Sequence, residues 1–162
     1  MEPPSDSPLL PPHGITASLD AATRQRLAAK GIFQDVKKGH TLVAQGEVHN
    51  RLFVLLEGEA VVTCYSPGQV IEIARLKAGD SIGEMSVMDP RPGSADVTLT
   101  SDGSIWSITR DDFFAFIHED KDAGIALLLA LAAELTGHLR HDDAKMLRQF
   151  EYQKDYYRAN DY

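Results

Sequence analysis

The most informative stretch of the chain covers residues 76–97 and reads LKAGDSIGEMSVMDPRPGSADV. Gly83 and Glu84 open a short amphipathic segment, Met85–Met88, which is long enough for one helical turn. The start of such a turn has free backbone N–H groups that suit an anion, and Glu84 can accept hydrogen bonds from ligand hydroxyls. A glycine-containing turn with a solvated glutamate fits the same residues equally well. The pattern alone therefore leaves two alternatives open, a small ligand site and an ordinary turn.

On both sides of this stretch, from Ile32 to Ile108, short runs rich in Val, Ile, Leu and Thr are separated by glycines. The pattern predicts antiparallel strands at close turn spacing, and hence a barrel, roll or sandwich rather than βαβ units. One run, Leu52–Leu56, is apolar throughout, so we expect both of its faces to be covered. The predicted strands are Ile32–Val36, Thr41–Ala44, Leu52–Leu56, Ala60–Tyr65, Val70–Leu76, Asp96–Thr100 and Ile105–Ile108.

Helical patterns flank the predicted strands. Ser18 is a good N-cap for a helix over residues 19–30, and a short helix, Asp112–Glu119, follows the last strand. A long helix is predicted from Ala123 to about Tyr157, which contains no proline. Its apolar residues recur at three- and four-residue steps, the spacing of a two-helix seam. The seam consists of Ile125, Leu128, Ala132, Leu135 and Leu139. Packing on the chain's own roll and pairing with a second copy both explain it.

Composition and motifs argue against several functional classes. The 162 residues fit one domain, and the net charge of −8 disfavours a surface for nucleic-acid phosphates or anionic lipid. Cys64 is the single cysteine, which excludes an internal disulfide and a cysteine-based metal site. His138 and His141 have a spacing that can bind a metal, but a solvated helix face is the better interpretation. We therefore predict no catalytic residue and no metal.

The chain divides into a flexible proline-rich arm (residues 1–16), one domain (17–150) and a C-terminal tail (151–162). Five of the eight prolines lie in residues 1–14. We expect no secretory signal and no apolar run long enough to cross a membrane, and hence a cytoplasmic protein. The 12 residues after Phe150 are too few for a DNA-binding domain.

The spaced glycines and the 76–97 stretch together resemble the cyclic nucleotide-binding domain. This is the sensory module of cAMP-receptor/Fnr-type bacterial regulators, of cyclic nucleotide-dependent kinases and of gated channels. The resemblance covers about Leu19 to Leu147. It implies an eight-stranded β-roll, a double-stranded β-helix of jelly-roll type, with one helix before it and two after it. The matching residues are Gly39, Gly46, Gly58-Glu59, Gly79-Asp80, Ile82-Gly83-Glu84-Met85, Pro92 and Ser94-Ala95.

The resemblance also implies a ligand site, the phosphate-binding cassette. Gly83 would let the backbone approach the ligand, and Glu84 would hold the ribose 2′-hydroxyl. Backbone amides of the short helix, the Ser94 hydroxyl and the Ala95 amide would face the cyclic phosphate. The implied ligand residues are Ile82, Gly83, Glu84, Met85, Ser86, Ser94 and Ala95. The long helix would cover the base and form a homodimer through Leu128, Ala132, Leu135 and Leu139.

The sequence departs from the family pattern where the phosphate would bind. The family places an arginine nine residues after the glutamate, where this chain has Gly93, and usually a threonine where it has Asp96. Arg91, two residues earlier, is a candidate substitute. Loss of the cationic partner predicts an affinity for the phosphate that is about 10- to 10³-fold lower.

We therefore expect a stand-alone, non-enzymatic sensor in signal transduction, with cAMP or cGMP as the ligand and no required cofactor. The alternative is a degenerate module that no longer binds ligand and acts in dimerisation or in contact with an unknown protein partner.

Overall fold

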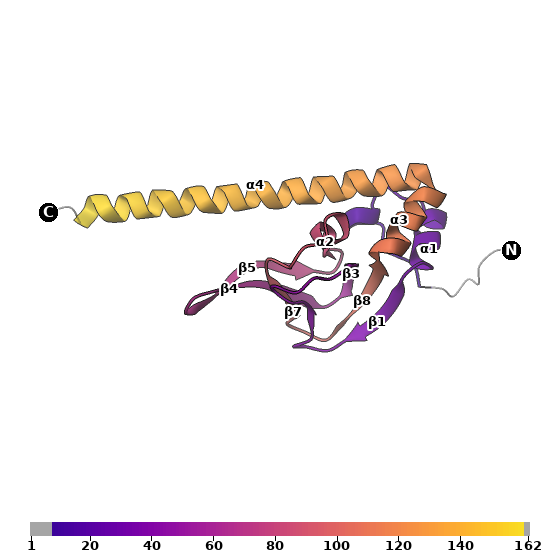
Figure 1. The fold of residues 1–162 in the computed structure, drawn as a ribbon, viewed down its shortest axis with the longest axis horizontal. Helices are drawn as coiled ribbons and strands as arrows, with labels where there is room; N and C mark the ends of the chain where they lie inside the picture. Colours follow the sequence, from indigo (N-terminus) through magenta and orange to yellow (C-terminus); the bar gives the residue numbers. More distant parts are fainter. Residues whose placement is uncertain (1–7, 161–162) are drawn as a thin grey trace.

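The computed structural model describes residues 8–160, with side chains described as far as residue 140. Two four-stranded antiparallel sheets form a β-roll, which confirms the predicted fold class (Figure 1). The strands are β1 (Ile32–Val36), β2 (Thr41–Val43), β3 (Arg51–Glu57), β4 (Glu59–Ser66), β5 (Gln69–Lys77), β6 (Ser81–Ile82), β7 (Asp96–Leu99) and β8 (Gly103–Thr109). The sheet orders are β1-β8-β3-β6 and β2-β7-β4-β5. Only β6 lacks a counterpart among the predicted strands, since two residues are too few to show alternation.

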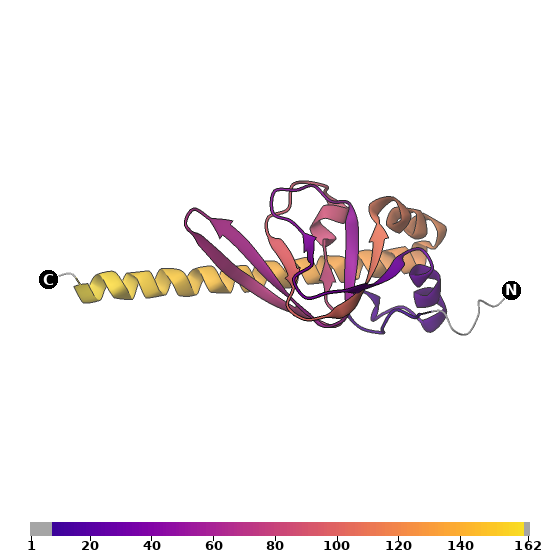
Figure 2. The ribbon, with the colours of Figure 1, turned by 90° about the horizontal axis from the view of Figure 1, so that it is seen from below.

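The helices are η1 (Gly14–Thr16), α1 (Ala21–Ala28), α2 (Glu84–Met88), α3 (Arg110–Glu119) and α4 (Lys121–Asn160). The start predicted for the first helix is wrong: the Asp20 carboxylate, rather than Ser18, caps α1 by accepting a hydrogen bond from the Thr23 amide at 2.7 Å. In two perpendicular views α4 runs along one side of the roll, over α2, and extends past it (Figures 1 and 2).

Strand β3 separates two apolar cores, which explains its unbroken apolar sequence. Phe53 and Leu55 point into the roll, whereas Leu52 and Val54 face the layer of helices. The expectation that both faces of this strand are covered is confirmed. Trp106 on β8 belongs to the helix-side core and has no exposed surface. Its indole N–H donates a hydrogen bond to the Ala28 carbonyl at 3.1 Å, tying α1 to the sheet.

Residues 8–16 pack against the domain rather than forming the flexible arm that their prolines indicated. Leu10 and Ile15 are buried in the helix-side core, and Thr16 donates hydrogen bonds to the carbonyls of Pro11 and His13. The packed domain therefore begins before residue 17, because these two apolar side chains are part of its core. The earlier part of the predicted arm, residues 1–7, and the end of the predicted tail, 161–162, lie outside the described residues.

The first half of α4 has two different faces. Leu127 and Leu131 are fully buried against the roll, while Leu129 and Leu139 are each 66% exposed. By length and composition Lys121–Arg140 is apolar enough to cross a membrane, which corrects the sequence-based expectation that no run is long enough. A core helix of a soluble protein passes the same test, and the buried leucines show that this helix packs on the roll.

Candidate functional site

The turn between β6 and α2 has the backbone shape of a ligand cradle. Gly83 has a φ of +87°, in the left-handed region, and precedes Glu84, the first residue of α2. A Cβ atom at position 83 would lie 2.5 Å from the Arg51 carbonyl oxygen, so only glycine fits here. The predicted helical turn therefore forms, with Glu84 inside the helix rather than just before it.

Glu84 is buried beneath α4. Glu84 is only 7% exposed, and its Oε1 atom lies 3.4 Å from His138 Nδ1. The imidazole of His138 is itself 57% exposed, so it covers the carboxylate from the solvent side. His138 lies on an exposed helix face, as predicted, and its contact with Glu84 is one that no spacing in the sequence indicated.

A second contact joins α4 to the same turn. The Ser81 hydroxyl donates a hydrogen bond to Glu134, one helical turn before His138. Burial raises the pKa of Glu134, and the negative charge of Glu84 acts in the same direction. The Ser81 hydrogen bond and His138 act against this shift. The site thus places the carboxylate of Glu134, on α4, near the carboxylate of Glu84, on α2.

Replacing Glu134 with glutamine is expected to stabilise the protein at neutral pH. The folded pKa of Glu134 lies above its ordinary value of 4.5, so its ionisation costs stability as the pH rises above that value. Glutamine keeps an acceptor for Ser81 and carries no charge. Urea unfolding should show that Glu134→Gln has a higher free energy of unfolding than wild type at about pH 7.5, and no such gain at about pH 4.5. An equal gain at both pH values would contradict a buried, ionisable Glu134.

His49 lies at the opposite edge of the turn and was not singled out from the sequence. Its Cε1 atom would be 2.8 Å from a Cβ on Gly83, and its Nδ1 atom is buried with no partner among the described residues. Burial lowers the pKa of His49, while a hydrogen bond to the Arg51 carbonyl and the charge of Glu84 oppose this change. No motif marks the position, because the β2–β3 loop reaches the cassette only in the folded chain.

The candidate substitute cation, Arg91, is directed elsewhere. Its side chain is 78% exposed, and Nε forms an ion pair with Asp89 Oδ2 at 2.7 Å. Gly93 supplies no side chain, and its amide and carbonyl are hydrogen-bonded to Glu47 and Gly46. The Asp96 carboxylate accepts a hydrogen bond from the Gln45 amide at 2.6 Å. Gly93 and Asp96, the two departures from the family pattern, therefore form hydrogen bonds that hold the loop between β2 and β3.

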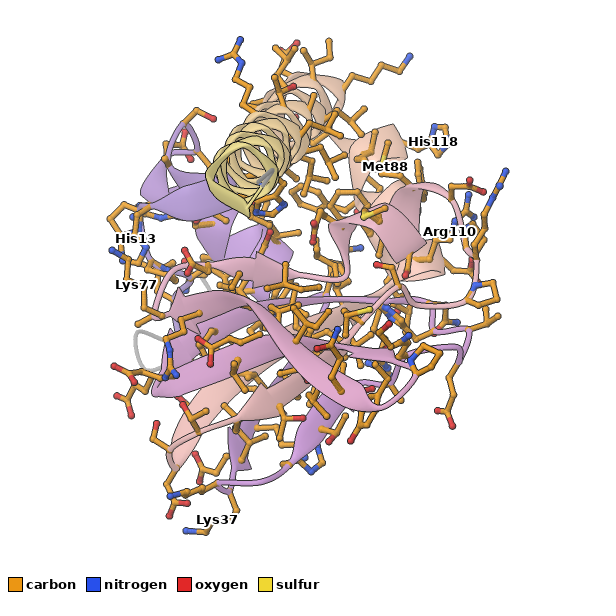
Figure 3. The ribbon with its side chains drawn as sticks, turned by 90° about the vertical axis from the view of Figure 1, so that its left-hand side faces the viewer. His13, Lys37, Lys77, Met88, Arg110 and His118 are labelled. Atoms are coloured by element: carbon orange, nitrogen blue, oxygen red, sulfur yellow. The ribbon has the colours of Figure 1, made fainter. Side chains whose placement is uncertain are left out.

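The other residues expected to line the site differ in exposure. Ile82, Ser86 and Ala95 are buried, whereas Met85 and Ser94 are exposed. Arg110 at the start of α3 supports the cassette from its far end, donating a hydrogen bond to the Val87 carbonyl at 2.9 Å. Arg110 and Met88 lie on the same flank of the molecule (Figure 3). The cassette is thus held by α3 at one end and by α4 along its length.

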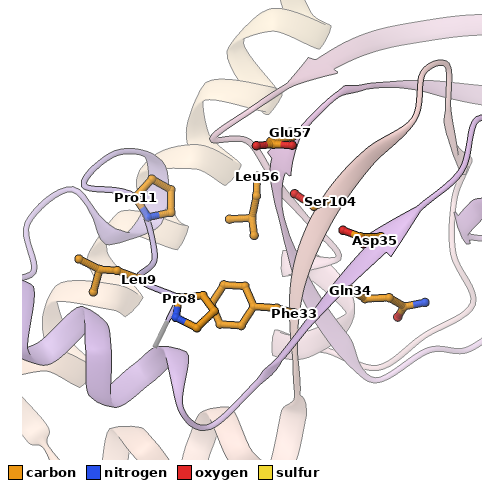
Figure 4. Close-up of a pocket in the computed structure, with 9 residues that line it drawn as sticks. All are labelled: Pro8, Leu9, Pro11, Phe33, Gln34, Asp35, Leu56, Glu57 and Ser104. Atoms are coloured by element: carbon orange, nitrogen blue, oxygen red, sulfur yellow. The ribbon is translucent and has the colours of Figure 1, made fainter. Parts of the chain in front are cut away.

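Two features lie outside this site. A groove of about 480 Å³ opens where Pro8 and Pro11 pass Phe33 and Leu56, and no cassette residue lines it (Figure 4). Among the described side chains, no three His, Cys, Asp or Glu residues are placed to hold a metal. The side chain of His141, half of the predicted histidine pair, lies outside that described part.

Comparison with known proteins decides the family. The model of the cyclic nucleotide-binding domain matches residues 33–120, more than half of the chain. The chain belongs to the cyclic nucleotide-binding domain family. The CRP-like cAMP-activated global transcriptional regulator of Mycobacterium tuberculosis is 28% identical over 123 residues, 75% of this chain and 53% of that protein. The chain therefore spans about half the length of this relative.

Other proteins are similar to this chain over comparable ranges. The Pycsar effector protein XpPycTIR of Xanthomonas perforans is 27% identical over 129 residues, 78% of this chain and 41% of that protein. The N-terminal domain of a transcriptional regulator from Streptomyces coelicolor superposes with a TM-score of 0.69 at 27% identity, covering 82% of this chain and 92% of that one. The Thermus thermophilus catabolite activator protein shares the fold, with a TM-score of 0.75 at 24% identity, covering 85% of this chain and 64% of that one.

Proposed function

We propose that this cyclic nucleotide-binding domain is a non-enzymatic, cytoplasmic sensor that binds cAMP or cGMP at the cassette and passes the signal to α4. The observation that carries the proposal is the buried Glu84 at the start of α2, directly after the left-handed Gly83. The carboxylate can accept hydrogen bonds from ligand hydroxyls, and α4 contacts the same residue. A relative that is cAMP-activated supports the choice of ligand.

The proposed affinity is low. Position 93 has no guanidinium, Arg91 is paired with Asp89, and the cassette brings Glu84 and Glu134 together. A phosphate bound here would lack the charge-assisted hydrogen bond that contributes roughly 1.5–3 kcal/mol. These observations also favour a second candidate, a module that binds no cyclic nucleotide and acts through a protein interface.

Melting temperatures separate the two candidates. A ligand that binds only the folded protein raises the melting temperature by mass action. We expect a rise in millimolar cAMP or cGMP that adenosine 5′-monophosphate at the same concentration does not produce. No rise with either cyclic nucleotide would favour the interaction module.

The outward face of α4 supports a homodimer. Ile125 is 57% and Leu139 is 66% exposed, Ala132 is exposed, and Leu128 and Leu135 are partly buried. Three of the five seam residues are therefore exposed, beside the face that packs on the roll. Continuous apolar residues along an unpartnered helix face fit a second copy of the same helix.

Replacing Leu139 with lysine is expected to weaken this dimer by roughly 100-fold, since each copy loses about 1.5 kcal/mol of apolar burial. Ala133, also exposed, lies about 100° round the helix from Ala132, so Ala133→Lys is the matched control. Sedimentation equilibrium measures the dimer dissociation constant of wild type and of each variant. A monomeric wild type, or equal effects of the two lysines, would contradict the seam.

A further inference from the structure

Two polar contacts join α4 to the cassette, and one of them involves Glu84, the side chain that a ligand hydroxyl would need. Ser81 and Glu84 belong to the turn, and they meet Glu134 and His138, which are four residues apart on α4. Residues at this spacing lie on the same face of a helix. This polar pair on α4, Glu134 and His138, lies between the buried Leu131 and the exposed Leu139.

We propose that His138 occupies Glu84 in the ligand-free protein, and that it thereby holds α4 on the cassette and lowers the affinity of the site for a ligand hydroxyl. Glu84 is 7% exposed, so a hydroxyl that approaches it must displace the imidazole that covers it. Ligand binding and loss of the contact between His138 and Glu84 then become one event. The identity of the ligand rests on the proposed function, whereas the contact between α4 and the cassette does not.

Charged groups around the turn act on this contact. Glu134 on α4 interacts with the charges of Glu84, His138 and Asp80, and His49 on the β2–β3 loop interacts with the charge of Glu84. Ionisation of Glu134 beside Glu84 adds repulsion between α4 and the cassette, whereas the contact of His138 with Glu84 holds the two together.

Amide hydrogen exchange of the full chain without ligand tests the contact. Protection factors over residues 130–140 in His138→Ala should fall two- to fivefold below those of wild type. Alanine favours a helix more than histidine does, so weaker helix formation cannot produce this loss. The matched control is His118→Ala, at an exposed site on α3. Protection equal to that of wild type would overturn the proposal.

Titration with cAMP and with 2′-deoxy-cAMP tests the competition. His138→Ala should bind cAMP two- to fivefold more tightly than wild type. The variant should bind 2′-deoxy-cAMP no better than wild type, because that ligand has no hydroxyl for Glu84. An equal gain for both ligands, or no gain, would overturn the competition. Absence of cAMP binding would count against the proposed function, and the exchange experiment would still decide the contact.

Discussion

Replacing Trp106 with alanine is expected to lower the free energy of unfolding by about 3–5 kcal/mol. The indole is fully buried between β8 and the helices, and its N–H satisfies the Ala28 carbonyl. Alanine would leave a cavity in the helix-side core and an unpaired buried carbonyl. Because small domains have only about 5–15 kcal/mol of stability, this single change would remove a large share of it.

Urea unfolding followed by circular dichroism measures the effect, since the variant has no tryptophan to report fluorescence. Tyr65→Ala serves as the control, because Tyr65 is 61% exposed on β4 and should cost less than about 1 kcal/mol. Similar losses in the two variants would show that Trp106 does not anchor the helices to the roll.

The sequence predicted those parts of the fold that local pattern encodes. The apolar run in β3 indicated two covered faces, and the glycine before Glu84 indicated a tight turn into a short helix. In both cases neighbouring residues determine the structure, through side-chain alternation or through a backbone angle that only glycine adopts easily. The seam on α4, inferred from its apolar repeat, stays a prediction.

The sequence did not predict contacts that depend on distant segments meeting. His49, Glu84 and His138 come from a loop, a one-turn helix and a long helix, and no spacing rule relates them. Leu10 and Ile15 are buried although the prolines around them indicated an extended arm. Whether an isolated apolar residue is buried depends on what packs over it, which the local pattern does not show.

Replacing Glu84 with glutamine is expected to weaken the binding of cAMP by at least about tenfold. An ionised acceptor contributes roughly 1.5–3 kcal/mol to a hydrogen bond, and about 1.4 kcal/mol corresponds to one order of magnitude in affinity. The amide keeps the shape of the side chain but loses its charge. Glu72→Gln on β5 is the matched control, because Glu72 pairs with Arg75 on an exposed strand.

Titration calorimetry of the full chain with cAMP, carried to millimolar ligand, tests whether Glu84 belongs to a working ligand site. We predict saturable binding in wild type and in Glu72→Gln, with a dissociation constant at least about tenfold larger in Glu84→Gln. Equal binding by all three proteins, or no saturable heat from wild type, would contradict this assignment.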